Sequence, residues 1–324
     1  MKFKIDNFVL AIIAVVIIAY FFPEPGSEQS KIPLNAISSI GVSLIFFFYG
    51  LKLSPGKIKS GLKNWKLHVL IQSSTYLLFP AIVILAYPFL KEAHFSIWLA
   101  FLFLAALPST VSSSVVMVSI AKGNVTSAIF NASISGIIGI LMTPLLMSFF
   151  LTANGESGNQ SEIIQQLLLK VLLPIILGIL LNPIFKKWVV KYSNIISEFD
   201  RLIILLIVYE SFSHAFIENI FVAVPALVFV ALAFSVVFLF FATYYILKFI
   251  AEKFNFKPKD VITTTFCGSK KSLVHGSLFL LVLGIPDDQK VLFLLPVMIY
   301  HSFQLFYVSW LANKIAKRAE FFEN

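Results

Sequence analysis

Apolar runs of membrane-spanning length alternate with short polar stretches along the whole chain. Ten such runs lie at residues 8–22, 34–51, 67–89, 96–121, 125–151, 164–184, 202–217, 222–250, 260–284 and 289–313. A helix of about 20 apolar residues crosses the ~30 Å hydrocarbon core of a bilayer. The pattern therefore predicts an all-α polytopic membrane protein with ten transmembrane helices. The first and seventh runs are short, and the fifth and eighth are long.

The composition supports a membrane protein and argues against several other classes. Of the 324 residues, 59% are hydrophobic and 13% are charged, whereas a soluble domain carries about 25% charged residues. This apolar excess is too large for one buried core, so a bilayer must act as the solvent. We expect no enzyme and no cofactor, because we find no phosphate-binding glycine loop, no His-Glu-x-x-His and no hydrolase triad.

Basic residues mark one side of the membrane. Nineteen Lys and Arg residues fall in alternate loops, including five in the loop 52–66, whereas the opposite loops hold only Lys31, Lys91 and Lys290. The positive-inside rule then predicts that both termini are cytoplasmic. The net charge of +9 is explained by these short loops, so the lipid bilayer is an expected partner and nucleic acid is not.

The runs divide into two halves of five. The polar stretch 153–163 separates residues 1–152 from residues 164–324. Because five is odd, the second half runs through the membrane in the opposite direction to the first. Segments 4 and 9 are both interrupted by polar residues, and paired interruptions of this kind indicate the binding site of a transporter. We therefore expect two inverted five-helix repeats.

Segment 4 is interrupted by a proline and a cluster of hydroxyl residues. The cluster consists of Pro108, Ser109, Thr110, Ser112, Ser113 and Ser114. Proline removes one helical hydrogen-bond donor and clashes with the preceding turn. The hydroxyl groups can satisfy the freed backbone or bind a substrate or ion, and we favour binding. The alternative is a close contact between helices through small hydroxyl residues.

Segment 9 is interrupted by two consecutive lysines. Its polar stretch holds Cys267, Gly268, Ser269, Lys270, Lys271 and Ser272, with His275 one turn further on. Lys270 lies ten residues after Asp260, which in a helix corresponds to a depth of ~15 Å. We expect a lysine that faces a cavity and binds an anion or replaces a bound metal cation. The alternative is that both lysines extend to the surface.

Segment 7 carries Glu210 and His214 on one helix face, because four residues separate them. These residues suit a proton path or a carboxylate partner for Lys270, and the alternative is a polar contact between helices. Gln72, Asn131, Ser135, His301 and Gln304 are isolated polar residues in other runs. Taken one at a time, each such residue is more typical of a hydrogen bond between helices than of a ligand.

Three stretches give the chain a family resemblance. Leu-Pro-Ser-Thr-Val-Ser-Ser-Ser-Val-Val-Met at 107–117, Ala-Lys-Gly-Asn-Val at 121–125 and Thr-Thr-Thr-Phe-Cys-Gly-Ser-Lys-Lys-Ser-Leu at 263–273 resemble the bile acid:sodium symporter family. The similarity is to its branch of bacterial orphan transporters with vertebrate relatives. It implies broken helices 4 and 9 that cross, a core and a panel domain, and an alternating-access cycle. It also implies the bacterial inner membrane.

The resemblance bears on ion coupling. Family members that cotransport sodium use a glutamine on helix 3, polar groups on helices 4 and 5, and a Glu-x-x-x-Gln stretch on helix 9. Gln72 matches the first, Ser112 to Ser114 match helix 4, and Asn131 and Ser135 match helix 5. On helix 9 the two positions fall on Phe266 and Lys270. We therefore expect that Lys270, with Lys271, occupies the space of the missing sodium ions, and that coupling is to protons or absent.

Two functions from different classes remain open at this stage. The first is a secondary transporter of a small organic anion, favoured by two buried lysines against one carboxylate. Sodium or a proton is the candidate coupling ion. The second is a membrane regulator of calcium homeostasis or envelope assembly without large solute flux, because the vertebrate relatives of the branch are associated with calcium regulation. The substrate and the oligomeric state are left open.

Overall fold

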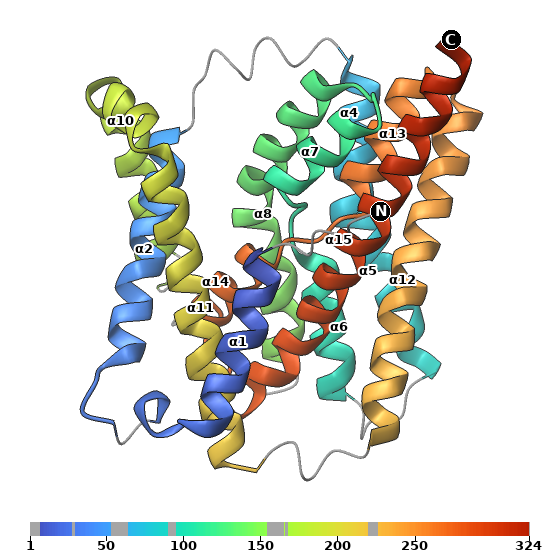
Figure 1. Ribbon diagram of the computed structural model, residues 1–324. Coiled ribbons are helices and arrows are strands. Elements are labelled where there is room, and N and C mark those ends of the chain that lie inside the picture. The colour runs from blue at the N-terminus through green and yellow to red at the C-terminus, as the bar shows by residue number, and fades with distance from the viewer. Residues whose placement is uncertain are drawn as a thin grey trace. The chain divides into compact units, whose positions relative to one another are not determined.

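The computed structural model describes residues 7–27, 30–52, 64–89, 95–153, 165, 168–219 and 226–323 (Figure 1). All regular structure in these ranges is helical. The helices are α1 (Asn7–Phe21), η1 (Glu24–Gly26), α2 (Leu34–Lys52), α4 (Trp65–Ser73), η3 (Ser74–Leu78), α5 (Phe79–Ala86), η4 (Tyr87–Phe89), α6 (Phe95–Ala106), α7 (Ser112–Ile120), α8 (Val125–Ala153), η6 (Leu168–Leu172), α10 (Leu173–Lys191), α11 (Ser193–Ile217), α12 (Ala226–Lys253), α13 (Pro258–Gly268), α14 (Leu273–Val282) and α15 (Asp287–Glu323).

Six helical stretches are long and apolar enough to cross a membrane. They are Leu34–Lys52, Trp65–Ala86, Val125–Leu151, Leu168–Phe185, Leu227–Lys253 and Asp287–Lys317. Two shorter apolar helices are Asn7–Phe21 and Phe95–Ala106. Each apolar run of the sequence coincides with a helix or with consecutive helices. The prediction of an all-helical membrane protein is therefore confirmed.

Helix α11 is longer than the apolar run of segment 7. The run begins at residue 202, whereas α11 begins at Ser193. The additional residues include Glu198 and Arg201, which form an exposed ion pair at 2.6 Å. A helix can continue beyond an apolar run, because its backbone bonds are internal and its polar side chains face water.

Both predicted interruptions are confirmed. Helix α6 ends at Ala106 and α7 begins at Ser112, whereas α13 ends at Gly268 and α14 begins at Leu273. Pro108 accounts for the first break, because it has no N–H and disfavours helical backbone at the residue before it. The second break contains no proline, and its exposed backbone groups are bound by side chains of other helices, as described below.

The chain forms two compact units. Unit 1 comprises Met1–Pro55, Ser148–Ala226 and Gly276–Val291, and unit 2 comprises Gly56–Met147, Leu227–His275 and Leu292–Asn324. Each unit takes segments from both halves of the sequence, so the units are not the two expected repeats. The repeats themselves stay a prediction, and residues 154–163 of the expected linker lie outside the described ranges.

Unit 1 is held together by close contact between helix backbones. In Figure 1, α2 and α10 lie side by side. A Cβ added to Gly178 would lie 2.2 Å from the Phe47 carbonyl oxygen, and one added to Gly50 would lie 2.3 Å from the Ile175 carbonyl oxygen. Only glycine allows this approach, which is typical of helix pairs in membranes. The Asn182 side chain adds a hydrogen bond to the Leu51 carbonyl.

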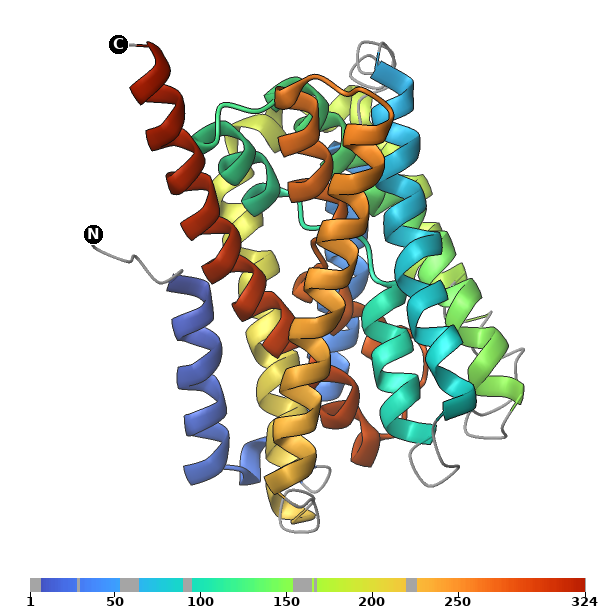
Figure 2. The same cartoon turned by 90° about the vertical axis from the view of Figure 1, so that its right-hand side faces the viewer.

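Unit 2 contains both broken helices and a core rich in aromatic residues. In Figure 2 the long α15 is red and α12 is golden orange. Phe240 of α12 lies against Tyr300 and Phe303 of α15, with ring centroids 5.9 and 5.3 Å apart. These edge-on contacts hold the two helices together, and Tyr300 also reaches the break after α13.

Candidate functional site

The two breaks lie against each other within unit 2. The Ser272 amide donates to the Pro108 carbonyl at 2.9 Å, and the Ser109 hydroxyl donates to the Cys267 carbonyl at 2.6 Å. Each unwound stretch thus supplies hydrogen bonds that the other has lost. The two polar stretches identified in the sequence therefore form one site, which we name the crossing (residues 107–114 and 267–272).

Side chains satisfy the backbone groups that the break after α13 exposes. Three side chains donate to carbonyls of this break in addition to Ser109. The Ser74 hydroxyl donates to the Gly268 carbonyl at 3.0 Å, and the Tyr300 hydroxyl donates to the Ser269 carbonyl at 2.7 Å. The Gln304 side-chain amide donates to the Lys271 carbonyl at 2.7 Å. The Gln304 amide also accepts from the Lys271 N–H at 2.8 Å. Ser269 donates its own hydroxyl to Thr265 within α13. A buried backbone group without a partner is costly, and these bonds explain why the break is tolerated.

The end of α6 exposes carbonyl groups for a related reason. The Ser109 N–H would bond Ala105 in a continuing helix, but it donates instead to the Ser135 hydroxyl of α8 at 3.0 Å. Pro108 has no N–H at all. The Ala106 carbonyl accepts from Thr143 at 2.7 Å. The carbonyls of Ala105 and Leu107 are thereby left for another donor.

Lys271 is that donor. Its Nζ donates to the carbonyls of Ala105 at 2.6 Å and Leu107 at 2.8 Å, and to the Thr75 carbonyl at 2.8 Å. The same ammonium lies 4.1 Å from the centroid of the Phe79 ring, within the range of a cation–π contact. Lys271 is 1% exposed. All three of its N–H donors therefore have acceptors.

Lys270 is placed differently, although it is the next residue. It is 0% exposed, and its Nζ donates to the Ser113 carbonyl of α7 at 3.1 Å. An ammonium has three N–H donors; among the described residues Lys270 has this one acceptor, whereas Lys271 has three. Both lysines are buried, which rules out the alternative that they extend to the surface.

The hydroxyl cluster of segment 4 bonds largely within itself. Thr110 and Ser114 share a hydrogen bond of 2.8 Å, and Ser113 donates to Thr110 at 2.9 Å. Ser112 is the first residue of α7, and its side chain lies outside the described residues. The cluster lies at the start of α7, where the Ser113 carbonyl accepts from Lys270.

The positions expected on helices 3 and 5 also lie together. Gln72 of α4 donates to the Asn131 side chain at 3.1 Å, while its own Oε1 is buried without a partner. Asn131 further contacts the ring of His68 at 2.7 Å. Ser135 binds Ser109, as described above, and its carbonyl accepts from the Tyr76 hydroxyl. The structure thus joins Gln72 with Asn131, and Ser135 with the crossing.

Three further residues of segment 9 have local contacts in the structure. His275 is buried, and its Nδ1 lies 3.0 Å from the Ser272 hydroxyl. Cys267 is a free, buried cysteine whose carbonyl takes part in the crossing. Gly268 packs closely, since an added Cβ would lie 2.8 Å from Leu247.

Glu210 and His214 belong to unit 1. The Ser38 hydroxyl donates to the Glu210 carboxylate at 3.2 Å. Both residues line a cavity of about 400 Å³ together with Asp287 and Lys290, which form an ion pair. The contact between Glu210 and Ser38 joins α11 to α2. The structure therefore supports the polar contact between helices, and it gives Lys270 a carbonyl acceptor where we had suggested Glu210.

Comparison with known proteins identifies the family. The SBF-like CPA transporter family matches residues 6–317 of the chain. The chain belongs to this family. Among its relatives, the Pseudomonas aeruginosa protein PA2026 is 36% identical over 98% of this chain and 95% of its own length. YfeH of Escherichia coli K12, named as a symporter, is 34% identical over 98% and 94%. Sodium/bile acid cotransporter 7-B of Xenopus laevis is 28% identical over 94% and 90%.

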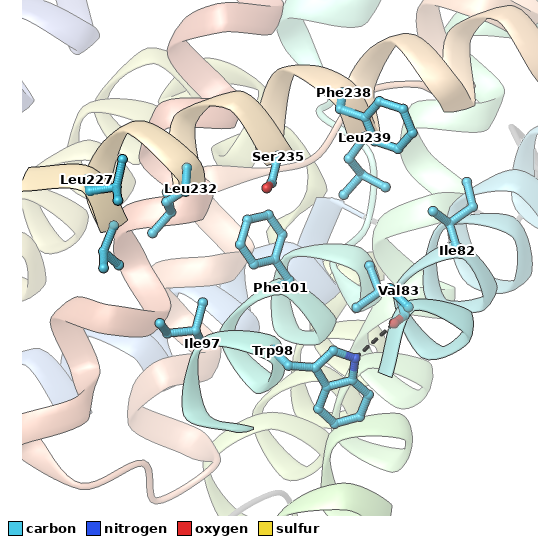
Figure 3. A pocket seen from close by; sticks show the side chains of 13 residues that line it. Ile82, Val83, Ile97, Trp98, Phe101, Leu227, Leu232, Ser235, Phe238 and Leu239 are labelled. Atoms are coloured by element: carbon cyan, nitrogen blue, oxygen red, sulfur yellow. Dashed lines mark hydrogen bonds between the residues drawn. The ribbon is translucent and has the colours of Figure 1, made fainter. Parts of the chain in front are cut away.

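Membership of the SBF-like CPA transporter family confirms the resemblance seen in the sequence. The chain is therefore a membrane transporter by family. Unit 2 also contains a cavity of about 560 Å³, which lies between α5, α6 and α12 (Figure 3). Its lining is apolar apart from Ser235 and the indole N–H of Trp98, which donates to the Val83 carbonyl at 2.8 Å. This cavity suits hydrocarbon and carries no charge.

The sequence analysis missed several residues that hold the crossing together. Phe79 and Tyr300 contact it, and Thr143 binds the Ala106 carbonyl just before it, but none is unusual in an apolar helix. Gln304 was recognised only as an isolated polar residue, and it does form an inter-helix bond. The contact of His68 with Asn131 was also missed. The spacing of four residues between His68 and Gln72 places both side chains on one helix face and could have indicated it.

Proposed function

We propose that this transporter carries a small organic anion across the membrane by alternating access. The observation that carries the proposal is the buried ammonium of Lys270, whose Nζ bonds one backbone carbonyl at 3.1 Å. A buried lysine is costly in a membrane unless it is paired or wetted, and it marks a substrate or ion pathway. An anionic group on the substrate would supply the missing acceptors.

The polarity of the broken helices supports an anion. Helix α7 begins at Ser112 and α14 begins at Leu273, so two helix N-termini lie at the crossing. Helix N-termini carry partial positive charge and favour anions, and transporters direct such ends at anionic substrate groups. Together with Lys270 they make this part of unit 2 electropositive.

The finer architecture is part of the proposal. We propose ten transmembrane segments arranged as two inverted repeats. Unit 2 would be the core domain, which contains the crossing, and unit 1 would be the panel domain. The ten apolar runs and the two broken helices support this assignment. The distribution of basic loops supports cytoplasmic termini, and the bacterial relatives in Pseudomonas and Escherichia support the inner membrane.

The contacts of Lys271 support a crossing without a free sodium ion. In transporters with broken helices, sodium is coordinated by unwound carbonyls and helix C-terminal ends. Here the carbonyls of Thr75, Ala105 and Leu107 already accept from Lys271, and the position of a helix 9 glutamine is taken by Lys270. We therefore propose transport that is independent of sodium or coupled to protons. The bile acid in the name of the Xenopus relative is not assumed as the substrate.

Uptake into proteoliposomes tests this function. Purified protein would be offered radiolabelled succinate, benzoate or taurocholate under a sodium gradient, a proton gradient or neither. We expect saturable uptake of at least one probe without a sodium requirement, and its loss in Lys270→Gln. Folded wild-type protein that transports none of these anions would contradict the proposal and favour the regulatory alternative. Strict sodium dependence would contradict the coupling.

A further inference from the structure

The surroundings of Lys271 resemble a cation site more than an ordinary lysine contact. Its Nζ is held by three backbone carbonyls, those of Thr75, Ala105 and Leu107, at 2.8, 2.6 and 2.8 Å. The Phe79 ring closes a further side at 4.1 Å. We name these three carbonyls and the ring the carbonyl cage. Its members come from two helices that are distant in sequence from Lys271.

The cage exists because the backbone is irregular in both helices, independently of the lysine. In the π-helical turn η3, the Phe79 N–H bonds the Ser74 carbonyl. The next bond in that pattern would join residue 80 to Thr75, but residue 80 is a proline without an N–H. At the end of α6, the Ser109 N–H is diverted to Ser135. Three buried carbonyls are thus left to converge on one point.

Converging carbonyls at a helix C-terminus attract a cation. The end of α6 carries the partial negative charge of its helix dipole, and such ends coordinate monovalent cations in transporters with broken helices. We infer that Lys271 is a tethered cation: its ammonium permanently occupies a site that would otherwise bind a small monovalent cation. The sequence suggested this role for Lys270 together with Lys271, and the geometry assigns it to Lys271.

The two lysines then have separate tasks. The three N–H donors of Lys271 are all used by the cage, so none remains for a substrate. Lys270 bonds only the Ser113 carbonyl among the contacts described and can bind the transported anion. The consequence for ion coupling rests on the transport function proposed above, because a filled cage removes the need for a free ion at this point. The cage itself does not depend on that function.

Chemical rescue of a truncated lysine tests the cage. Lys271→Ala deletes Cγ, Cδ, Cε and Nζ, and n-propylammonium supplies the same four heavy atoms. In the purified full-length protein we expect Lys271→Ala to lower the melting temperature by roughly 5–10 °C. Added n-propylammonium chloride should restore several degrees of this loss, because it binds only the folded state. The melting temperature of Lys271→Ala would also be measured in sodium chloride, potassium chloride and choline chloride at the same ionic strength.

Lys270→Ala is the matched control, since it removes the neighbouring buried ammonium but only one carbonyl contact. Each of the four salts should raise the melting temperature of Lys270→Ala by the same small amount, relative to the same variant without added salt. Rescue of Lys271→Ala by n-propylammonium, sodium or potassium, with choline inactive, supports the cage. Equal rescue of both variants, or no rescue by any of the three small cations, overturns it.

A measurement on the unaltered protein keeps the inference testable if Lys271→Ala does not fold. With the cage filled, the wild-type melting temperature should be the same in sodium chloride and in choline chloride of equal ionic strength. A sodium-specific rise would show that a free ion binds and would overturn the inference. Neither experiment needs a substrate, so failure of the uptake assay and failure of the cage can be told apart.

Discussion

The two compact units hold their helices together by opposite means. In unit 1 the backbones of α2 and α10 touch directly through Gly50 and Gly178, and the charged Glu210 meets the side chain of Ser38. In unit 2 the backbone is broken at two places, and side chains from other helices bind the exposed carbonyls. A charged side chain on a regular helix must hydrogen-bond another side chain, whereas a charged side chain beside a broken helix can hydrogen-bond the exposed backbone carbonyls.

The difference explains why the buried lysines of unit 2 need no carboxylate. A regular helix uses its own carbonyls internally, so it offers a cation few acceptors in a membrane. The break at Pro108 and the π-helical turn before Pro80 release carbonyls at one point. Lys271 takes three of them. Three experiments test this contrast, beginning with the contact that should be least tolerant of change.

Gly178→Ala should have the largest effect. Its new Cβ would lie 2.2 Å from the Phe47 carbonyl oxygen and 2.9 Å from the Leu51 nitrogen, and backbone atoms cannot move aside as a flexible side chain can. Overpacking of this kind costs about 1–3 kcal/mol or more. We expect the largest fall in melting temperature of the three variants. Leu180→Ala on the same helix is the control, because Leu180 is 66% exposed and should change little. A Gly178→Ala protein as stable as the control would show that α2 and α10 do not rely on backbone contact.

Ser109→Ala should have an intermediate effect. It removes the hydroxyl that donates to the Cys267 carbonyl at 2.6 Å and leaves that buried carbonyl without this donor. Hydrogen bonds between membrane helices contribute about 0.6 kcal/mol on average and up to about 1.7, so we expect a loss of ~1 kcal/mol in unfolding by denaturant in detergent. Ser43→Ala is the matched control. The Ser43 hydroxyl donates to the Ser39 carbonyl of its own helix, so its loss should have little effect. Equal stabilities for the two variants would show that the bond from the Ser109 hydroxyl to the Cys267 carbonyl does not stabilise the break.

Some of this contrast could be predicted from the sequence. The polar interruptions at Pro108 and Lys270 predicted both breaks, and the distance of Lys270 from Asp260 predicted a buried lysine. The acceptors of Lys271 could not be predicted, because one of them depends on Pro80, six segments earlier, which has no N–H to donate to the Thr75 carbonyl. The suggested pairing of Glu210 with Lys270 stays a prediction. The bond from Lys270 to the Ser113 carbonyl could not be predicted either, because a sequence does not reveal which backbone carbonyls are free to accept it.

Glu210→Gln should have the smallest effect and gives the sharpest test of how unit 1 treats charge. The Ser38 hydroxyl donates to Glu210 at 3.2 Å, and the Oε1 of glutamine can accept the same bond. The substitution keeps the length of the side chain and removes its charge from a cavity that also holds the Asp287–Lys290 pair. We expect the stability to remain within about 0.5 kcal/mol of wild type, measured by the same denaturant series. Glu218→Gln, at an exposed position at the end of the same helix, is the control for loss of a negative charge. If Glu210→Gln were as damaging as Ser109→Ala, the charge itself would be structural, and unit 1 would depend on its buried carboxylate as unit 2 depends on Lys271.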